Sequence, residues 1–473
     1  MTKLDIDQIL SGRAGEELEL NERYLNPQFV RVLRTLGFDR SWARASGAHL
    51  VDQSGARYLD MLGGYGVFAV GRNNPAVRSQ LERLLAAETA NLPQMGVSLL
   101  SGVLAEELLS RSPSGLGAVM LTNSGAESVE AAIKLARAAT ERPRILYCEH
   151  AFHGLTLGAL SVNGNPEFRE RFGPLLPGCD AIPFGDLDVL RRELEAEDVA
   201  AFLVEPIQGK TVRIPDASYL PSAQELCRRH GALFAVDEVQ TGLGRTGRFL
   251  ALEHWSLEPD VVTVSKALSG GYVPVGAVLA TRAVFDRVFD SMERSVVHGS
   301  TFGTNDLAAA AGIATLAELD EAGLIEHARR MGDLLLELTT PFVERFEIVR
   351  EVRGLGLLWA IELGDPDGGL SRRLWQSVER RQPGLFAQLI AVPLFTEHRI
   401  LTQVAGHHVN IIKATPPLVI EEADVRGFAD ALQAVIERAE RLPRAMTRFA
   451  FSMARGAIRG RPANRRSAQS VAD

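Results

Sequence analysis

Three segments of the sequence end a run of apolar residues on ionisable side chains. AAFLVE ends on Glu205, LFAVDE ends on Asp237 and Glu238, and DVVTVSK ends on Lys266. Such runs are typical of buried strands, and ligands of open α/β sheets bind outside the carboxyl ends of the strands. Carboxylates and an amine gathered there could carry out acid–base and nucleophilic chemistry. One shared site explains the pattern better than three solvated strand ends.

Lysine is rare in this chain, and it can do chemistry that arginine cannot. Only five of the 51 basic residues are lysines: Lys3, Lys134, Lys210, Lys266 and Lys413. An ammonium group can lose its proton and become a nucleophile, whereas a guanidinium group stays charged. The sequence therefore offers two candidates for a nucleophile, Lys210 within LVEPIQGKTVR and Lys266 at a strand end.

Two further strands lead into residues that could bind a flat, phosphorylated ligand. GAVMLT runs into NSGAES, where the backbone amides of Ser124, Gly125 and Ala126 at a helix start would suit a phosphate. An N-cap without a ligand is the simpler interpretation of that segment alone. EHAFHG places Phe152 and His153 after another strand, where an aromatic ring either stacks on a planar ligand or joins the core.

Asp237 and Lys266 complete a set that describes one cofactor. Asp237 could pair with a protonated ring nitrogen, the Lys266 amine could react with an aldehyde, and the small residues of ALSGG would let a bulky ligand lie close. Together with a phosphate cradle and a stacking face, these groups predict pyridoxal phosphate.

A dinucleotide is the competing interpretation, because Gly242-Leu-Gly244-Arg-Thr-Gly247 matches G-x-G-x-x-G after a strand. Two acids, Asp237 and Glu238, precede these glycines and would repel a pyrophosphate. No clear helix or ribose-binding acid follows at the spacing that a dinucleotide fold requires. Pyridoxal phosphate is therefore the preferred prediction.

Six ordered motifs resemble those of the class III aminotransferases, the group of ornithine, acetylornithine and ω-aminotransferases. They are NSGAES, HAFHG, VEPIQG, VDEVQTGLGRTG, TVSKALSGG and HGSTFGTND, and the resemblance covers about residues 40–435. It implies a fold-type-I α/β protein, a homodimer with active sites at the subunit interface, and transfer of an amino group between a donor and an aldehyde or keto acceptor. An aminomutase of the same fold and a catalytically silent binding protein are the alternatives.

The resemblance also implies a role for each matching residue. Lys266 carries the cofactor as a Schiff base, and Asp237 pairs with the pyridine nitrogen. The other implied cofactor contacts are Ser124, Gly125 and Ala126 for the phosphate, Phe152 and Val239 on the two ring faces, Gln240 near the ring hydroxyl, His153, Glu205, and Thr301 of the partner subunit.

Two positions depart from the family pattern. Where many members have a glutamate that covers an arginine until a carboxylate substrate displaces it, this chain has Lys210 and Lys413. If the two lysines face each other, an anionic group should lie between them, because two cations otherwise repel. Alternatively, Lys210 points to solvent and Lys413 alone binds a carboxylate. Lys210, Lys413 and Tyr65 are the candidate substrate-binding residues, with glutamate as the expected donor and an ornithine or acetylornithine enzyme as the alternative.

The C-terminal part suggests a large substrate and a membrane. The stretch GLFAQLIAVPLFTEHRILTQVAGHHVNIIKATPP is more apolar than a small diamine requires, and it resembles the hopanoid-type branch, which favours a large apolar or lipid-like acceptor. The adjacent His407 and His408 would face opposite ways on a strand, so no metal site is predicted. In the tail, Arg444, Arg448, Arg455 and Arg459 share one face of a predicted helix. Peripheral contact with an anionic membrane is one interpretation, beside a helix on the dimer or a disordered tail.

Composition favours a cytoplasmic protein with no nucleic-acid partner. The net charge is −8, and Cys148, Cys179 and Cys227 lack a metal-like spacing. The N-terminus has no apolar segment typical of a signal peptide, and no apolar run is long enough to span a membrane.

The expected architecture is α/β with a mostly parallel central sheet and a smaller α+β domain. Residues 1–47 predict a helical arm, and HLVDQSGARYLDM predicts a hairpin. The expected units are 1–69 as the arm and part of the small domain, 70–325 as the large cofactor-binding domain, 326–440 as the small domain, and 441–473 as a basic tail. The expected strands of the large domain are 117–122, 144–148, 200–205, 233–238 and 260–266.

Overall fold

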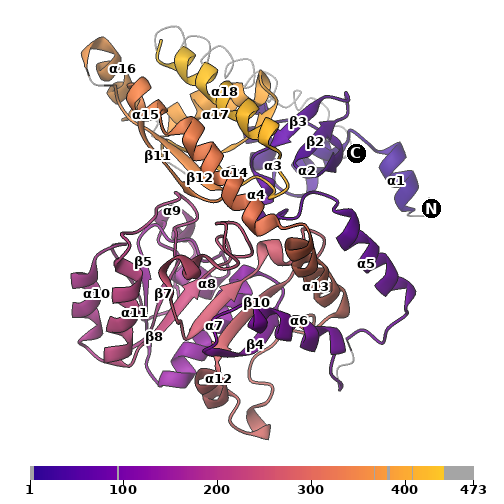
Figure 1. Ribbon diagram of the computed structural model, residues 1–473, viewed down its shortest axis with the longest axis vertical. Coiled ribbons are helices and arrows are strands. Elements are labelled where there is room, and N and C mark those ends of the chain that lie inside the picture. The colour runs from indigo at the N-terminus through magenta and orange to yellow at the C-terminus, as the bar shows by residue number, and fades with distance from the viewer. Residues whose placement is uncertain (1–4, 93–94, 367, 381–383, 407–408, 442–473) are drawn as a thin grey trace, which may run out of the picture.

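The computed structural model describes residues 5–92, 95–366, 368–380, 384–406 and 409–441 (Figure 1). Its largest sheet has the strand order β4-β10-β9-β8-β7-β5-β6. These strands are β4 (Leu116–Thr122), β5 (Arg144–Cys148), β6 (Cys179–Ile182), β7 (Val199–Val204), β8 (Leu233–Asp237), β9 (Val261–Val264) and β10 (Gly276–Thr281). Only β10 among them runs antiparallel to its neighbours β4 and β9. The prediction of a mostly parallel sheet is confirmed.

Helices cover both faces of this sheet. Along β7, Phe202 and Val204 belong to one core, while Ala201 and Leu203 belong to the other. This alternation follows from the two-residue period of a strand, and burial on both faces explains why β7 is apolar throughout. The helices that contribute to these cores include α7 (Gly125–Thr140) and α12 (Arg282–Val288) on one face, and α10 (Leu187–Leu194), α11 (Tyr219–His230) and α13 (Asp306–Glu321) on the other.

Two four-stranded sheets lie in the other half of the molecule, above the large sheet in Figure 1. One has the order β1 (Trp42–Ser46), β2 (His49–Asp52), β3 (Arg57–Asp60) and β13 (Ile400–Leu401). The other has the order β11 (Val349–Leu355), β12 (Leu358–Leu363), β15 (Ile411–Ala414) and β14 (Gln403–Val404). The helices of this half include α14 (Leu324–Thr339), α15 (Phe342–Arg345), α16 (Gly369–Glu379), α17 (Leu385–Thr396) and α18 (Glu422–Ala439).

The remaining helices are short or lie near the N-terminus. They include α1 (Ile6–Gly12), α2 (Glu17–Tyr24), α3 (Pro27–Leu36), α4 (Gly63–Gly66), α5 (Pro75–Ala86), α6 (Leu99–Ser110), α8 (Leu157–Ser161) and α9 (Pro166–Arg169), and the 3₁₀ turns η1 (Ala251–Trp255), η2 (Lys266–Ser269) and η3 (Met292–Arg294). The predicted helical arm 1–47 is wrong at its end, because Trp42–Ser46 pairs with β2 as a strand. The hairpin that follows is confirmed as β2 and β3. The domain boundaries stay a prediction.

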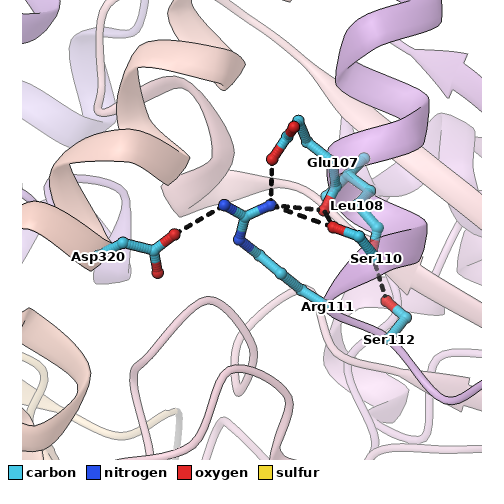
Figure 2. Close-up of polar contacts among 6 residues, drawn as sticks. All are labelled: Glu107, Leu108, Ser110, Arg111, Ser112 and Asp320. Carbon is cyan, nitrogen blue, oxygen red and sulfur yellow. Dashed lines mark hydrogen bonds and ion pairs between the residues drawn. The ribbon is translucent and has the colours of Figure 1, made fainter.

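Helix α6 is fastened to α13 by one arginine, as Figure 2 shows. Arg111, at the end of α6, donates to the Asp320 carboxylate at 2.7 Å and to the Glu107 carbonyl oxygen at 2.9 Å, and it also pairs with the Glu107 carboxylate. Helix α13 in turn packs against η2, the turn that begins at Lys266.

The apolar residues of the stretch 384–417 have a structural explanation. Most of α17 is buried: Phe386, Ala387, Leu389, Ile390, Ala391, Val392, Leu394 and Phe395. The helix packs against α16, α18 and the strands β13, β14 and β15. Core packing accounts for the composition that suggested a lipid-like acceptor. His407, His408 and the arginine-rich tail lie outside the described residues.

The glycines of the G-x-G-x-x-G match serve close packing. Gly244 and Gly247 have φ of 88° and 79°, and a Cβ on Gly247 would lie 2.8 Å from Arg329 Cβ on α14. The loop leads into η1 and not into a phosphate-binding helix. Within the described ranges, no helix has the length and apolarity to cross a membrane, and no cluster of three or more His, Cys, Asp or Glu could hold a metal.

Candidate active site

Lys266 lies two residues after the end of β9, at the start of η2. Its φ is 39°, which is a rare conformation for a residue other than glycine. The residue is half-buried. Burial lowers the pKa of Lys266, although the nearby carboxylates of Asp237 and Glu205 act to raise it. The parallel strands β7, β8 and β9 thus bring together the three groups that the sequence placed at strand ends.

The Asp237 carboxylate is held by three hydrogen bonds. Oδ1 accepts from the Val239 amide and the Thr263 hydroxyl, both at 3.0 Å, and Oδ2 lies 2.6 Å from His153 Nδ1. Asp237 is only 3% exposed. A carboxylate oxygen can accept two bonds, so Oδ2 keeps one lone pair for a further donor.

His153 connects the segment after β5 to Asp237. Burial lowers the pKa of His153, but the hydrogen bond and the charge of Asp237 outweigh it, so the pKa is raised overall. Its Nε2 is buried and has no partner within the described part of the chain. His153 therefore orients the Asp237 carboxylate through Nδ1, and its Nε2 is left for a ligand.

Glu205 organises the backbone around the site. Its Oε2 accepts from the Phe152 amide at 3.0 Å, and its Oε1 accepts from the Gly209 amide at 2.9 Å. Burial raises the pKa of Glu205; His153 lowers it, and Asp237 raises it further. Glu205 thereby joins the loop after β5 to the loop after β7.

The start of α7 forms a narrow cradle. Ser124 is the N-cap, and its hydroxyl accepts from the Glu127 amide at 3.1 Å. A Cβ on Gly125 would lie 2.7 Å from Val239 Cγ1, so only glycine lets the first turn approach this closely. The amides of Gly125 and Ala126 belong to the first turn of a long helix, where N–H groups lack helical acceptors and attract anions.

Phe152 lies in the segment after β5 and Val239 in the segment after β8, and both residues are half-buried. The Phe152 ring meets the Phe168 ring edge-on, with centroids 5.5 Å apart. Phe168 belongs to α9, which was not predicted to matter. Asn165, which caps that segment, was likewise missed, because nothing in its sequence context signals a role.

Tyr65 and Gln240 meet at the rim. Gln240 Nε2 donates to the Tyr65 carbonyl oxygen at 3.1 Å, and the Tyr65 residue is 58% exposed. Tyr65 has a φ of 61°, between glycines that also have positive φ. Its backbone conformation is strained for a residue with a Cβ.

Lys413 is buried on β15, where it is 4% exposed. Its Nζ donates to the Gly209 carbonyl oxygen at 2.7 Å. Burial lowers the pKa of Lys413 to about 7; Lys266 and Arg245 lower it further, and Glu205 raises it. Arg245 is itself buried, and its Nη2 has no partner among the described residues. Sequence reasoning missed Arg245, because its segment was considered as a dinucleotide loop and as a family motif without a role for the arginine.

Lys210 does not point to solvent, so that part of the alternative is wrong, while binding of a carboxylate by Lys413 alone stays a prediction. Its side chain is 11% exposed and forms an ion pair of 2.7 Å with Glu167. It also donates to Asn165 Oδ1 at 2.7 Å. Two facing lysines would require an anionic group between them. Lys210 does meet a carboxylate, that of Glu167 on α9, but Lys413 contacts the Gly209 carbonyl oxygen and not this carboxylate.

Thr301 is exposed near the start of α7 in its own subunit. The preceding Ser300 accepts a hydrogen bond at 2.7 Å from Asn123, the residue before the N-cap. The role of Thr301 in the site of a partner subunit stays a prediction.

Comparison with known proteins decides the family. A model of class-III aminotransferases matches residues 37–436. The chain belongs to the class III aminotransferase family. It is 34% identical over 467 residues to Aminotransferase PigE of a Serratia species, which covers 91% of this chain but only 55% of PigE. It is 43% identical over 364 residues to putrescine aminotransferase of Pectobacterium atrosepticum, which covers 73% of this chain and 76% of that protein.

Solved structures of this aminotransferase family share the fold. The ornithine aminotransferase of Toxoplasma gondii, whose structure has partial occupancy of PLP at its active site, matches with a TM-score of 0.79 and 28% identity. The match covers 93% of this chain and 100% of that one. The fold-type-I architecture and the pyridoxal-phosphate cofactor are confirmed for this aminotransferase.

The residues of the site fit that cofactor. The aminotransferase offers a helix N-terminus where a Cβ would clash, a carboxylate with a lone pair to spare, and the half-buried amine of Lys266 near that carboxylate. These features match a phosphate, a pyridine nitrogen and an aldehyde, respectively.

Proposed function

We propose that this aminotransferase is of the ω-amine type and takes its amino group from an amino-acid donor, glutamate first, for transfer to an aldehyde or keto acid. The observation that carries the proposal is Lys413. It is a buried cation beside the Lys266 amine, and its hydrogen bond goes to a neutral carbonyl rather than to a carboxylate. Such a group attracts a carboxylate of the substrate.

Lys266 performs the proton transfers of this reaction. It would hold the cofactor at its aldehyde and, once released, accept and return the substrate proton at Nζ. The lowered pKa of Lys266, caused by burial, makes the neutral amine accessible. Bound pyridoxal phosphate supplies an electron-accepting ring.

Asp237 would keep a proton on the ring nitrogen of the cofactor. The Val239 amide, the Thr263 hydroxyl and His153 fix the direction of its carboxylate. Since Asp237 is buried, water does not compete for that contact.

The remaining residues would bind and orient the cofactor. Ser124, Gly125 and Ala126 would hold the phosphate, Phe152 and Val239 the ring faces, and Gln240 the ring hydroxyl, with His153 and Glu205 supporting them. Thr301 of the partner subunit would complete the phosphate site in a homodimer. Tyr65 at the rim and Lys413 would contact the substrate, while Lys210 acts from further away.

Lys413 also bears on which donor is preferred. The relative named putrescine aminotransferase has 43% identity, so a diamine is the natural competitor. A diamine would bring its second ammonium group towards protonated Lys413 and be repelled, whereas the glutamate carboxylate is attracted. Ornithine, which carries both charges, falls between them and is the second candidate.

The acceptor is proposed only as an aldehyde or keto acid. The apolar residues that suggested a lipid-like acceptor are buried in α17, so they do not support one. A cytoplasmic location and contact of the tail with a membrane stay predictions from sequence.

A single-turnover experiment tests the proposal. The purified holoenzyme is mixed at pH 6.5 with glutamate, alanine, ornithine, putrescine or a long-chain amine, and the change of the cofactor from its aldehyde to its amine form is followed by absorbance. Glutamate should react fastest, and the keto acid should form in equal amount. A faster reaction with putrescine, or return of the aldehyde form without a keto acid as in an aminomutase, would overturn the proposal.

A further inference from the structure

We propose that Lys210 is a positioning residue whose ammonium group fastens α9 to the loop after β7 and thereby holds the Phe152 ring in place. The contact of Phe152 with a cofactor rests on the proposed function, but the fastening itself does not. Lys210 is thus neither the nucleophile nor a direct ligand of the substrate.

Lys210 makes three contacts with the segment of α9. Its Nζ lies 2.7 Å from Asn165 Oδ1 and 2.7 Å from Glu167 Oε1, and 5.0 Å from the centre of the Phe168 ring. A charged hydrogen bond, an ion pair and a cation–π contact converge on one largely buried ammonium group. These contacts fix α9 relative to Lys210.

Asn165 extends this connection to the segment that bears Phe152. It is 3% exposed, and its Nδ2 donates to the Ala151 carbonyl oxygen at 2.8 Å. Phe168 reaches the same segment through its edge-on contact with Phe152 at 5.5 Å. Moving Lys210 should therefore disturb Phe152 by two routes.

The base of the Lys210 side chain is itself anchored. Arg353 of β11 donates to the carbonyl oxygens of Thr211 at 2.8 Å and Val212 at 3.0 Å, and Lys413 donates to that of Gly209. Val212 has a φ of 54°, an unusual conformation for a β-branched residue. The loop is held on both sides of Lys210, so the ammonium group acts from a rigid base.

Gly406 explains how the side chain is accommodated. A Cβ on Gly406 would lie 2.2 Å from Lys210 Cε and 3.0 Å from Nζ, and the φ of Gly406 is not in the left-handed region. Glycine there leaves the space through which the lysine stem passes. An alanine would displace the flexible end of Lys210 without straining the backbone.

The charge of Glu167 explains why a lysine suits position 210. A glutamate at position 210 would face the Glu167 carboxylate, and like charges at hydrogen-bond distance repel. Lysine at 210 therefore belongs with Glu167 and Asn165. The carboxylate of a substrate is left to Lys413.

The first test compares Lys210→Met with wild type and with Lys134→Met, a control at an exposed lysine. Hydrogen exchange at the amides of residues 150–170, the near-UV and visible circular dichroism, and the rate of cofactor loss are all measured in the holoenzyme. Lys210→Met should speed exchange at Phe152 and Phe168 and speed cofactor loss on the order of tenfold, while Lys134→Met changes neither. Unchanged exchange in Lys210→Met would overturn the proposal.

A second test moves Lys210 without replacing it. Gly406→Ala should produce the same changes, and Gly406→Ala combined with Lys210→Met should be no worse than Lys210→Met alone, because both act on one ammonium group. Glu167→Gln gives a third variant if Lys210→Met does not fold. Additive effects of the two substitutions would contradict the proposal.

Kinetics separate positioning from direct substrate binding. If Lys210→Met raises the KM for glutamate and leaves amide exchange and circular dichroism unchanged, Lys210 binds substrate and the proposal is wrong. If wild type shows no transamination at all, the proposed function fails, whereas the exchange data still decide the fastening of α9.

Discussion

Lys413 Nζ donates to the carbonyl oxygen of Gly209 at 2.7 Å, across the boundary between β15 and the loop after β7. The lysine is 4% exposed, and its hydrogen bond goes to a neutral acceptor. A buried cation without a carboxylate partner is costly, and the loss of a proton relieves that cost. The charge of this side chain should therefore depend on pH and on the substrate.

Recognition of a carboxylate donor should weaken as pH rises. Burial lowers the pKa of Lys413 to about 7, so the free enzyme loses this proton above that pH. Between pH 7 and 9, kcat/KM for glutamate should fall by up to about tenfold per unit. In Lys413→Arg, whose guanidinium stays charged, the fall should disappear. A flat wild-type profile, or the same slope in both enzymes, would contradict this role.

The stability of the protein should change with pH for the same reason. The pKa of Lys413 is lowered on folding from 10.5 to about 7, so between these values the unfolded chain holds the extra proton. The free energy of unfolding contributed by this group should therefore rise with pH above 7. Urea unfolding of wild type and Lys413→Met at pH 7 and 9 serves as a control on the kinetic prediction.

Asp237 and His153 should contribute unequally to turnover. Asp237→Asn removes the charge that would hold the ring nitrogen proton, and single-turnover rates should fall by at least about 100-fold. His153→Gln leaves the carboxylate and two of its three hydrogen bonds in place, so a loss of roughly tenfold is expected. If His153→Gln were the more damaging change, the assignment of Asp237 would be wrong.

The cradle at the start of α7 should not accept a methyl group. In Gly125→Ala the new Cβ would lie 2.7 Å from Val239 Cγ1, which pushes the first turn away from the ring and should weaken cofactor binding on the order of tenfold. Gly102→Ala is the matched control, because Gly102 lies on the exposed side of α6 and its Cβ would meet nothing within 4 Å. The control should gain up to about 1 kcal/mol of stability. Equal cofactor affinities measured by equilibrium dialysis would refute the cradle.

Two substitutions of Tyr65, whose backbone is left-handed, should separate the effect of backbone strain on stability from the effect of the ring on donor binding. Tyr65→Ala and Tyr65→Gly both remove the ring, but at a φ of 61° only glycine is free of strain. Thermal unfolding should show Tyr65→Gly more stable than Tyr65→Ala by about 1 kcal/mol. Both should lose donor affinity equally. Different KM values for the two variants would show that the backbone, and not the ring, determines binding.

The sequence predicted best where local pattern and tertiary position coincide. Glu205, Asp237 and Lys266 follow mostly apolar strands, and parallel pairing of these strands brings the three groups to one edge of the sheet. The N-cap at Ser124 was visible for the same reason, since small residues between a strand and a helix specify that turn.

The sequence predicted worst where partners meet across distance. Lys210 pairs with Glu167, 43 residues away, and no local pattern indicates which carboxylate a lysine will meet. The stretch that forms α17 shows the second difficulty. Apolar residues without a polar face indicate burial, but they do not tell a core helix from the wall of a pocket. The strand β10 is not among the predicted strands, because its mostly small, apolar residues GAVLAT show no alternation of apolar and polar side chains.

The most direct test of the account is the covalent position of the cofactor. Treating the holoenzyme with borohydride reduces the bond between the cofactor and its lysine, and peptide mass spectrometry then shows which lysine carries the added group. The account predicts modification of Lys266 alone, and none after preincubation with glutamate that has converted the cofactor to its amine form. Modification of Lys210 or Lys413 in place of Lys266 would contradict it.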